Sequence, residues 1–91
     1  MMLLVTYSLK VPGRDYGKLY ETLKSSRHWC HYLESTWLIV TDESVEVWRD
    51  KLIAVMDEND RLLVADITNS QLTGLLPRKA WDWLNRSKSK A

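Results

Sequence analysis

Ser8 lies where an apolar stretch, Met2 to Leu9, ends and the turn Lys10-Val11-Pro12-Gly13 begins. A polar side chain at the junction of a strand and a turn is placed to meet a ligand. A carboxylate there could hold a divalent cation, whereas a neutral hydroxyl is a poor ligand for Mg²⁺, which is bound through carboxylates and waters. Because this residue is a serine, we expect no metal and no cofactor here.

Asp66 is a second candidate for chemistry because it is a carboxylate within an apolar strand pattern, residues 61–68. Two interpretations stay open. The charge could discourage edge-to-edge pairing of strands. Alternatively, Asp66 could be a weak substitute metal ligand, because strand alternation groups it with mixed polar positions like those of Thr6 and Ser8.

The other polar groups carry weaker signals. His28 and His31 are three residues apart on a predicted strand and should point to opposite faces, which makes them a poor metal pair. The acidic run at 57–60 could bind a cation but is more typical of a solvated turn. The lone Cys30 predicts a buried thiol in a reducing compartment, which indicates the cytoplasm.

Basic residues gather near the C-terminal end although the net charge is only +1. Arg78, Lys79, Arg86 and Lys88 could contact the phosphates of a nucleic acid, or they could form a solvated tail. The chain also contains five Trp and four Tyr but no Phe. Rings with a polar atom are enriched at interfaces, so this composition indicates a protein–protein contact.

Hydrophobic periodicity predicts the elements that position these groups. We expect strands at 2–9, 27–33, 36–41 and 61–68, and helices at 14–26, 45–56 and 78–85. Ser44 is a candidate cap of the second helix. Two βαβ halves of this kind predict an α+β, ferredoxin-like βαββαβ sheet of four antiparallel strands, with strands one and three central and two helices on one face. Residues 1–86 should form one domain and 87–91 a disordered tail.

The sheet face opposite the two helices has no cover of its own unless the C-terminal helix reaches it. Leu4, Thr6, Ser8 and Asp66 suggest a mixed surface that suits a partner subunit better than water, and this predicts a two-fold homodimer. No segment reaches the roughly 18 apolar residues of a membrane span, and no signal peptide is recognisable, so we expect no membrane partner.

Three motifs carry a resemblance: Thr6–Leu9, Trp29–Leu38 and Lys79–Leu84. They are similar to small bacterial proteins labelled the SinR family, which is related to the CRISPR-associated Cas-two and VapD endoribonucleases. The resemblance implies a ferredoxin-like protomer that dimerises through its sheet. In the nuclease relatives a Tyr-Asp pair ends the first strand, and the paired aspartates hold a divalent metal. Here Tyr7 matches, but the aspartate position is Ser8.

Three functions therefore remain open. The first is a non-catalytic dimeric module that binds nucleic acid or a protein partner. The second is a metal-dependent endoribonuclease or toxin-like nuclease that uses Mg²⁺ and ligands other than the missing aspartate. The third is a purely structural protein-interaction dimer. Without the carboxylate at Ser8, a metal-activated water has no obvious source, which favours the first and third functions.

Overall fold

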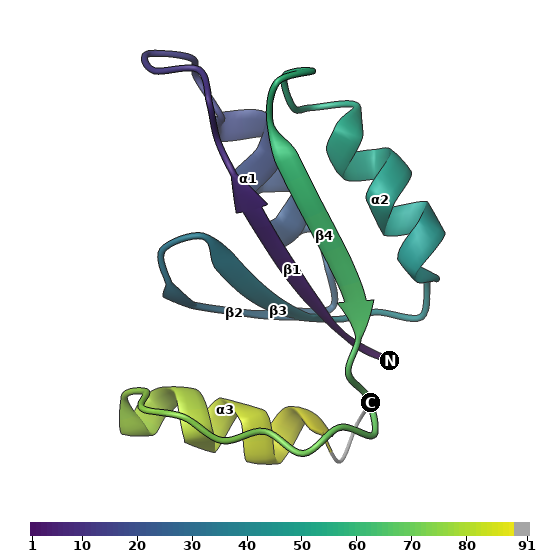
Figure 1. Cartoon of the computed structure of the whole chain (residues 1–91). Coiled ribbons are helices and arrows are strands. Elements are labelled where there is room, and N and C mark those ends of the chain that lie inside the picture. Colours follow the sequence, from purple (N-terminus) through teal and green to yellow (C-terminus); the bar gives the residue numbers. More distant parts are fainter. Residues whose placement is uncertain (89–91) are drawn as a thin grey trace.

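The computed structural model describes residues 1–88 and folds them into a four-stranded antiparallel sheet with three helices (Figure 1). The strands are β1 (Met2–Ser8), β2 (His28–Leu33), β3 (Thr36–Val40) and β4 (Arg61–Asp66). The helices are α1 (Gly17–Lys24), α2 (Val45–Ile53) and α3 (Arg78–Lys88).

The strand order is β2-β3-β1-β4, so β1 and β3 are central, as the sequence predicted. β1 pairs antiparallel with both neighbours: Val5 lies opposite Trp37 of β3 and opposite Val64 of β4. A central strand has neighbours on both sides, and β1 is covered on both faces in its first half, which accounts for the apolar run from Met2 to Val5.

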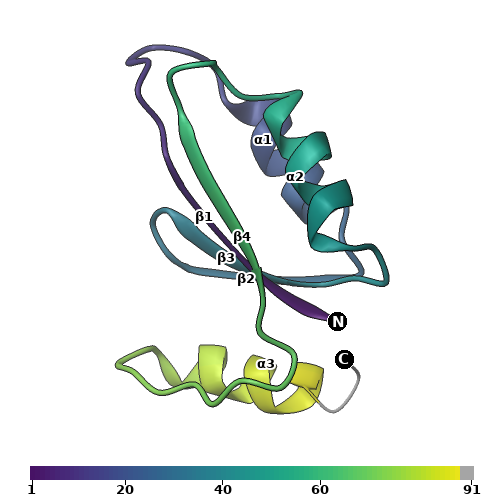
Figure 2. The same cartoon turned by 45° about the vertical axis from the view of Figure 1, so that its right-hand side comes forward.

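α1 and α2 cover one face of the sheet, which we call the first face (Figure 2). Each helix presents a buried pair four residues apart, Leu19 with Leu23 and Trp48 with Leu52, because residues at this spacing share one side of a helix. These side chains pack on the odd-numbered residues of the central strands. The buried strand members of this core are Leu3, Val5, Tyr7, Trp37 and Ile39.

α3 lies across the opposite face, which we call the second face (Figures 1 and 2). Leu84 of α3 packs on Met2 and Val40, and all three side chains are at most 3% exposed. The C-terminal helix therefore covers part of the surface that the sequence left without cover. No helix in residues 1–88 is long and apolar enough to cross a bilayer.

The largest errors in the predicted boundaries are at helix ends, where they reach three residues, whereas the strand ends differ by two at most. α1 begins at Gly17 instead of residue 14, because the Asp15 carboxylate accepts a hydrogen bond from the Gly17 N–H at 2.8 Å and forms a turn first. α2 begins as predicted, with the Val47 N–H donating to the Ser44 hydroxyl at 3.2 Å. It ends at Ile53, not at residue 56.

The predicted tail is wrong at its first two residues. α3 continues to Lys88, and Ser87 is only 4% exposed against the rest of the domain. The domain therefore extends past residue 86. The remainder of the predicted tail, 89–91, lies outside the described residues.

Candidate functional site

The end of β1 separates the two residues of the nuclease-like motif. Tyr7 points into the core, 7% exposed, and its hydroxyl accepts a hydrogen bond from the Trp37 indole N–H at 2.9 Å. Burial raises the pKa of Tyr7 above its ordinary value, although the Trp37 bond acts in the opposite direction. Tyr7 is therefore a neutral core residue, and its side chain lies on the opposite face of the sheet from that of Ser8.

Ser8 is exposed on the second face and lies opposite Arg61 of β4. Thr6, Ser8, Arg61 and Leu63 contribute to a shallow hollow there. The Arg61 guanidinium donates to the carbonyls of Asn59 and Asp60, at 3.3 and 3.0 Å, which holds the positive charge at this end of the strand. A guanidinium at this end of the sheet favours an anion over a metal cation. Arg61 has no signal in the sequence that links it to Ser8, because only the strand register brings the two residues together.

Asp66 does not share a face with Ser8, so its predicted place beside Thr6 and Ser8 is wrong. It pairs with Leu3, whose side chain is fully buried on the first face, whereas Ser8 pairs with Arg61 at the other end of β4. The Asp66 carboxylate accepts from the Thr68 hydroxyl at 2.5 Å and the Thr68 N–H at 3.0 Å, and these bonds lower its pKa. Asp66 therefore stabilises the end of β4 and is not a ligand partner of Ser8.

The predicted dimer surface changes accordingly. Leu4 lines a cavity beneath α3, and Asp66 belongs to the other face. Thr6 remains on the second face, but its hydroxyl hydrogen-bonds that of Thr36 at 3.0 Å. Only Thr6 and Ser8, of the four predicted residues, stay on an open part of this face.

The four predicted basic residues all lie on α3. Arg78, Lys79 and Arg86 are exposed, since the helix docks through its opposite, apolar side, where Ala80 and Leu84 are buried. Lys88 is half-buried, and its ammonium donates to the Ser70 carbonyl at 2.5 Å. Asp82, also exposed, reduces the net charge of the helix. α3 thus brings three of the four cations to the outer surface of the domain.

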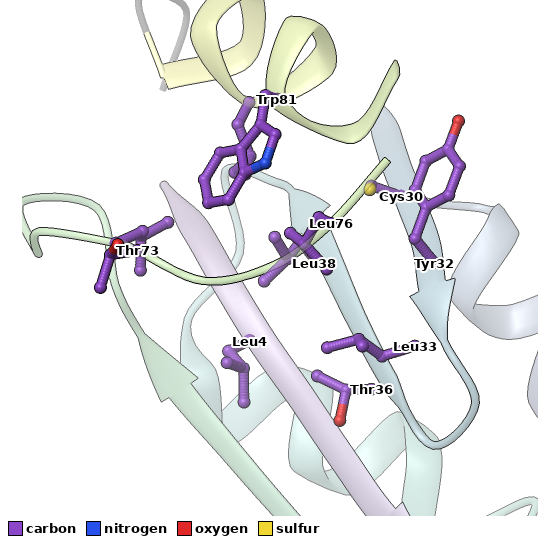
Figure 3. A pocket seen from close by; sticks show the side chains of 11 residues that line it. Leu4, Cys30, Tyr32, Leu33, Thr36, Leu38, Thr73, Leu76 and Trp81 are labelled. Atoms are coloured by element: carbon purple, nitrogen blue, oxygen red, sulfur yellow. The ribbon is translucent and has the colours of Figure 1, made fainter. Parts of the chain in front are cut away.

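An apolar cavity of about 150 Å³ lies between the second face and α3 (Figure 3). Trp81 and Leu76 approach it from the side of α3, and Leu4 and Leu38 line it from the sheet. Burial raises the pKa of the Cys30 thiol, which also borders the cavity, so the reactive thiolate is disfavoured. Apart from Cys30 and Tyr32, no side chain that lines the cavity is ionisable. The lining therefore contains no carboxylate or imidazole that could act as a general acid or a general base.

The acidic run at 57–60 is not a fully solvated turn, because Asp60 is only 9% exposed. Its carboxylate accepts from the Lys10 N–H at 2.7 Å, the Asp57 N–H at 2.8 Å and the Tyr16 hydroxyl at 2.9 Å. Burial would raise the pKa of Asp60, but these hydrogen bonds outweigh it and hold the pKa below its ordinary value. Asp60 therefore ties the turn before α1 to the turn before β4.

Replacing Asp60 with asparagine should lower stability at neutral pH and flatten its acid dependence. Because the folded-state pKa of Asp60 is lowered, its carboxylate stabilises the fold above the unfolded-state pKa of about 3.9 and loses this effect as pH falls through the lowered value. Urea unfolding at about pH 7 and about pH 3 would measure the difference. Glu58→Gln, at an exposed neighbour, is the control. An equal pH dependence in both variants would contradict this role.

Residues 1–88 contain no group of three His, Cys, Asp or Glu side chains that could hold a metal ion. His28 and His31 follow the prediction of opposite faces: His28 pairs with Val40, whereas His31 stacks on the Trp37 ring with centroids 3.9 Å apart. No protein-family model matches the chain, and no curated protein matches it. A relation to the SinR family rests on the sequence motifs alone.

Proposed function

We propose that this chain is a non-catalytic binding module on a ferredoxin-like sheet, and that its ligand is a nucleic acid contacted through the outer side of α3. The strand order β2-β3-β1-β4, with α1 and α2 on one face, supports the ferredoxin-like assignment. We also propose that the chain is related to the SinR and Cas-two proteins, that it forms a two-fold homodimer and that it is cytoplasmic.

The observation that carries the proposal is the exposed set of Arg78, Lys79 and Arg86 on a docked helix. Arg78 and Arg86 are two turns apart, about 12 Å along the helix axis. Burial of Ala80 and Leu84 on the other side holds the helix on the domain, so these cations are presented from a fixed element. Contacts of this kind bind phosphates without reading sequence.

Binding without cleavage is supported by the end of β1. Ser8 stands beside Arg61 there, and Asp66 is at the other end of β4 on the opposite face. A metal-dependent nuclease would need carboxylates that converge on a cation. The endoribonuclease alternative therefore loses the substitute ligand that the sequence offered for it.

A gel-shift series with single-stranded RNA at rising salt tests this function. We expect the double variant Arg78→Gln/Lys79→Gln to bind more weakly and to reduce the slope of log affinity against log salt by about 1.4, since each phosphate contact to a single strand contributes ~0.7. The matched control, Lys10→Gln/Lys18→Gln, removes the same charge from exposed positions before and within α1, and it should retain the wild-type slope.

Three outcomes would contradict the proposal. Equal slopes in the two double variants would show that α3 is not the contact surface. No binding at the lowest salt would leave a protein-interaction dimer as the function. Shortened RNA after incubation with Mg²⁺ would restore the nuclease alternative.

A further inference from the structure

β4 is the outermost strand on one side of the sheet, and half of its backbone polar groups point away from the domain. The Ile67 N–H donates to the Met2 carbonyl at 2.9 Å, which directs residue 67 toward β1. Backbone groups alternate in direction along an antiparallel strand, so residues 61, 63 and 65 also face β1. The N–H and C=O groups that point outward are those of Leu62, Val64 and Asp66.

The middle of this edge, Leu62 to Ala65, lacks the features that usually prevent strand pairing. β4 contains no proline, and its register with β1 runs without interruption from Arg61 to Asp66. Its only charges are at those two ends. The opposite edge strand, β2, has a register irregularity between Cys30 and Leu33. β4 is therefore the edge that is suited to receive another strand.

Apolar side chains flank the β4 edge on both faces of the sheet. Leu63 is 60% exposed on the second face, and Ile53 of α2 is 56% exposed beside the first face. A hollow of about 310 Å³ opens between α2 and β4, and Ile53, Leu62, Leu63 and Val64 contribute to its lining. A strand added here would bury exposed apolar surface as well as form hydrogen bonds.

We propose that the β4 edge pairs antiparallel with β4 of a second copy of this chain, which joins the two sheets into one. A two-fold axis perpendicular to the sheet keeps α1 and α2 of both copies on the same side. It also brings the Arg61 end of each strand to the Asp66 end of the other. This interface depends on the homodimer of the proposed function, but it does not depend on the proposed nucleic-acid ligand.

The charges on α2 favour a second copy over an unrelated peptide. Glu46 and Arg49 both line the hollow, one helical turn apart. The Arg49 guanidinium donates to Asp50 of its own chain at 3.0 Å and is still exposed, and across the two-fold axis the antiparallel α2 helices bring both signs of charge from each copy to the same seam. A surface with its own complementary charges is self-complementary, as an isologous dimer requires.

Amide hydrogen exchange by NMR at increasing protein concentration tests the edge directly. The amides of Leu63 and Ala65 bond to β1 and should exchange slowly at every concentration. Those of Leu62, Val64 and Asp66 should exchange fast when dilute and at least ~10-fold slower where light scattering shows a dimer. Fast exchange of these three amides in a dimeric sample would overturn the β4 interface and leave the homodimer on another surface. A monomer at all concentrations would overturn both.

Two variants make the test specific. Leu63→Lys places a charge on the edge, and Ile53→Glu places one in the hollow, so each should weaken dimerisation at least ~10-fold in sedimentation equilibrium. The matched controls are Leu75→Lys and Val47→Glu. Leu75 is exposed in the segment before α3, and Val47 lies about 120° around α2 from Ile53. Equal dimer affinity in all four folded variants would overturn the proposal.

Discussion

Replacing Trp37 with alanine should lower the free energy of unfolding by about 3–5 kcal/mol. The indole is only 1% exposed and stacks on the His31 ring, with centroids 3.9 Å apart, and more distantly on Tyr20. It also donates the hydrogen bond to the Tyr7 hydroxyl. A domain of this size has a total stability of roughly 5–15 kcal/mol, so the variant should be close to unfolded. Urea denaturation followed by far-ultraviolet circular dichroism measures the loss.

Trp37→Phe separates the packing of the ring from its hydrogen bond. Phenylalanine keeps most of the buried apolar surface but removes the indole N–H, which leaves the Tyr7 hydroxyl without this donor. We expect a loss of about 1–3 kcal/mol for this variant. If alanine and phenylalanine at this position cost the same, packing around Trp37 would not be the main source of stability.

Replacing Leu84 with alanine should release α3 from the sheet at a cost of about 2–4 kcal/mol. Leu84 is 3% exposed and packs on Met2 and Val40, in a cluster separate from the main core under α1 and α2. Because the two clusters lie on different faces, the loss should be local. Amides of α3 should exchange at least ~10-fold faster, while those of β1 and β3 change less.

Leu75→Ala is the control for Leu84→Ala, since Leu75 is 98% exposed in the segment that leads to α3. It should leave exchange in α3 unchanged. Uniformly faster exchange in α3 and the central strands of the Leu84 variant would show instead that the two faces unfold as one cooperative unit.

The order of the elements could be predicted because each has a clear hydrophobic period. Leu19 with Leu23 and Trp48 with Leu52 show the helical spacing, and both pairs are buried as expected. The central place of β1 followed from its apolar sequence and is confirmed by the strand order. Local patterns of this kind are present in the sequence itself.

The face of Asp66 could not be predicted, because both sets of alternate residues in β4 contain apolar side chains. Pairing with Leu3 decides the question, and that register is a contact between distant segments. The burial of Asp60 could not be predicted for the same reason. Its acidic neighbours are typical of a solvated turn, whereas the backbone donor at Lys10 lies fifty residues away in sequence. Non-local partners leave no periodic signal in the chain.

The central position of β1 has a consequence for synthesis of the protein. β1 is translated before both of the strands it pairs with, β3 and β4. Translation proceeds at about 5–20 residues per second, so at least about a second passes between the synthesis of β1 and that of β3, the first of these partners. During that interval the segment from Met2 to Ser8 has no native ladder to join. Protection of the nascent chain by a chaperone would therefore matter most at this strand.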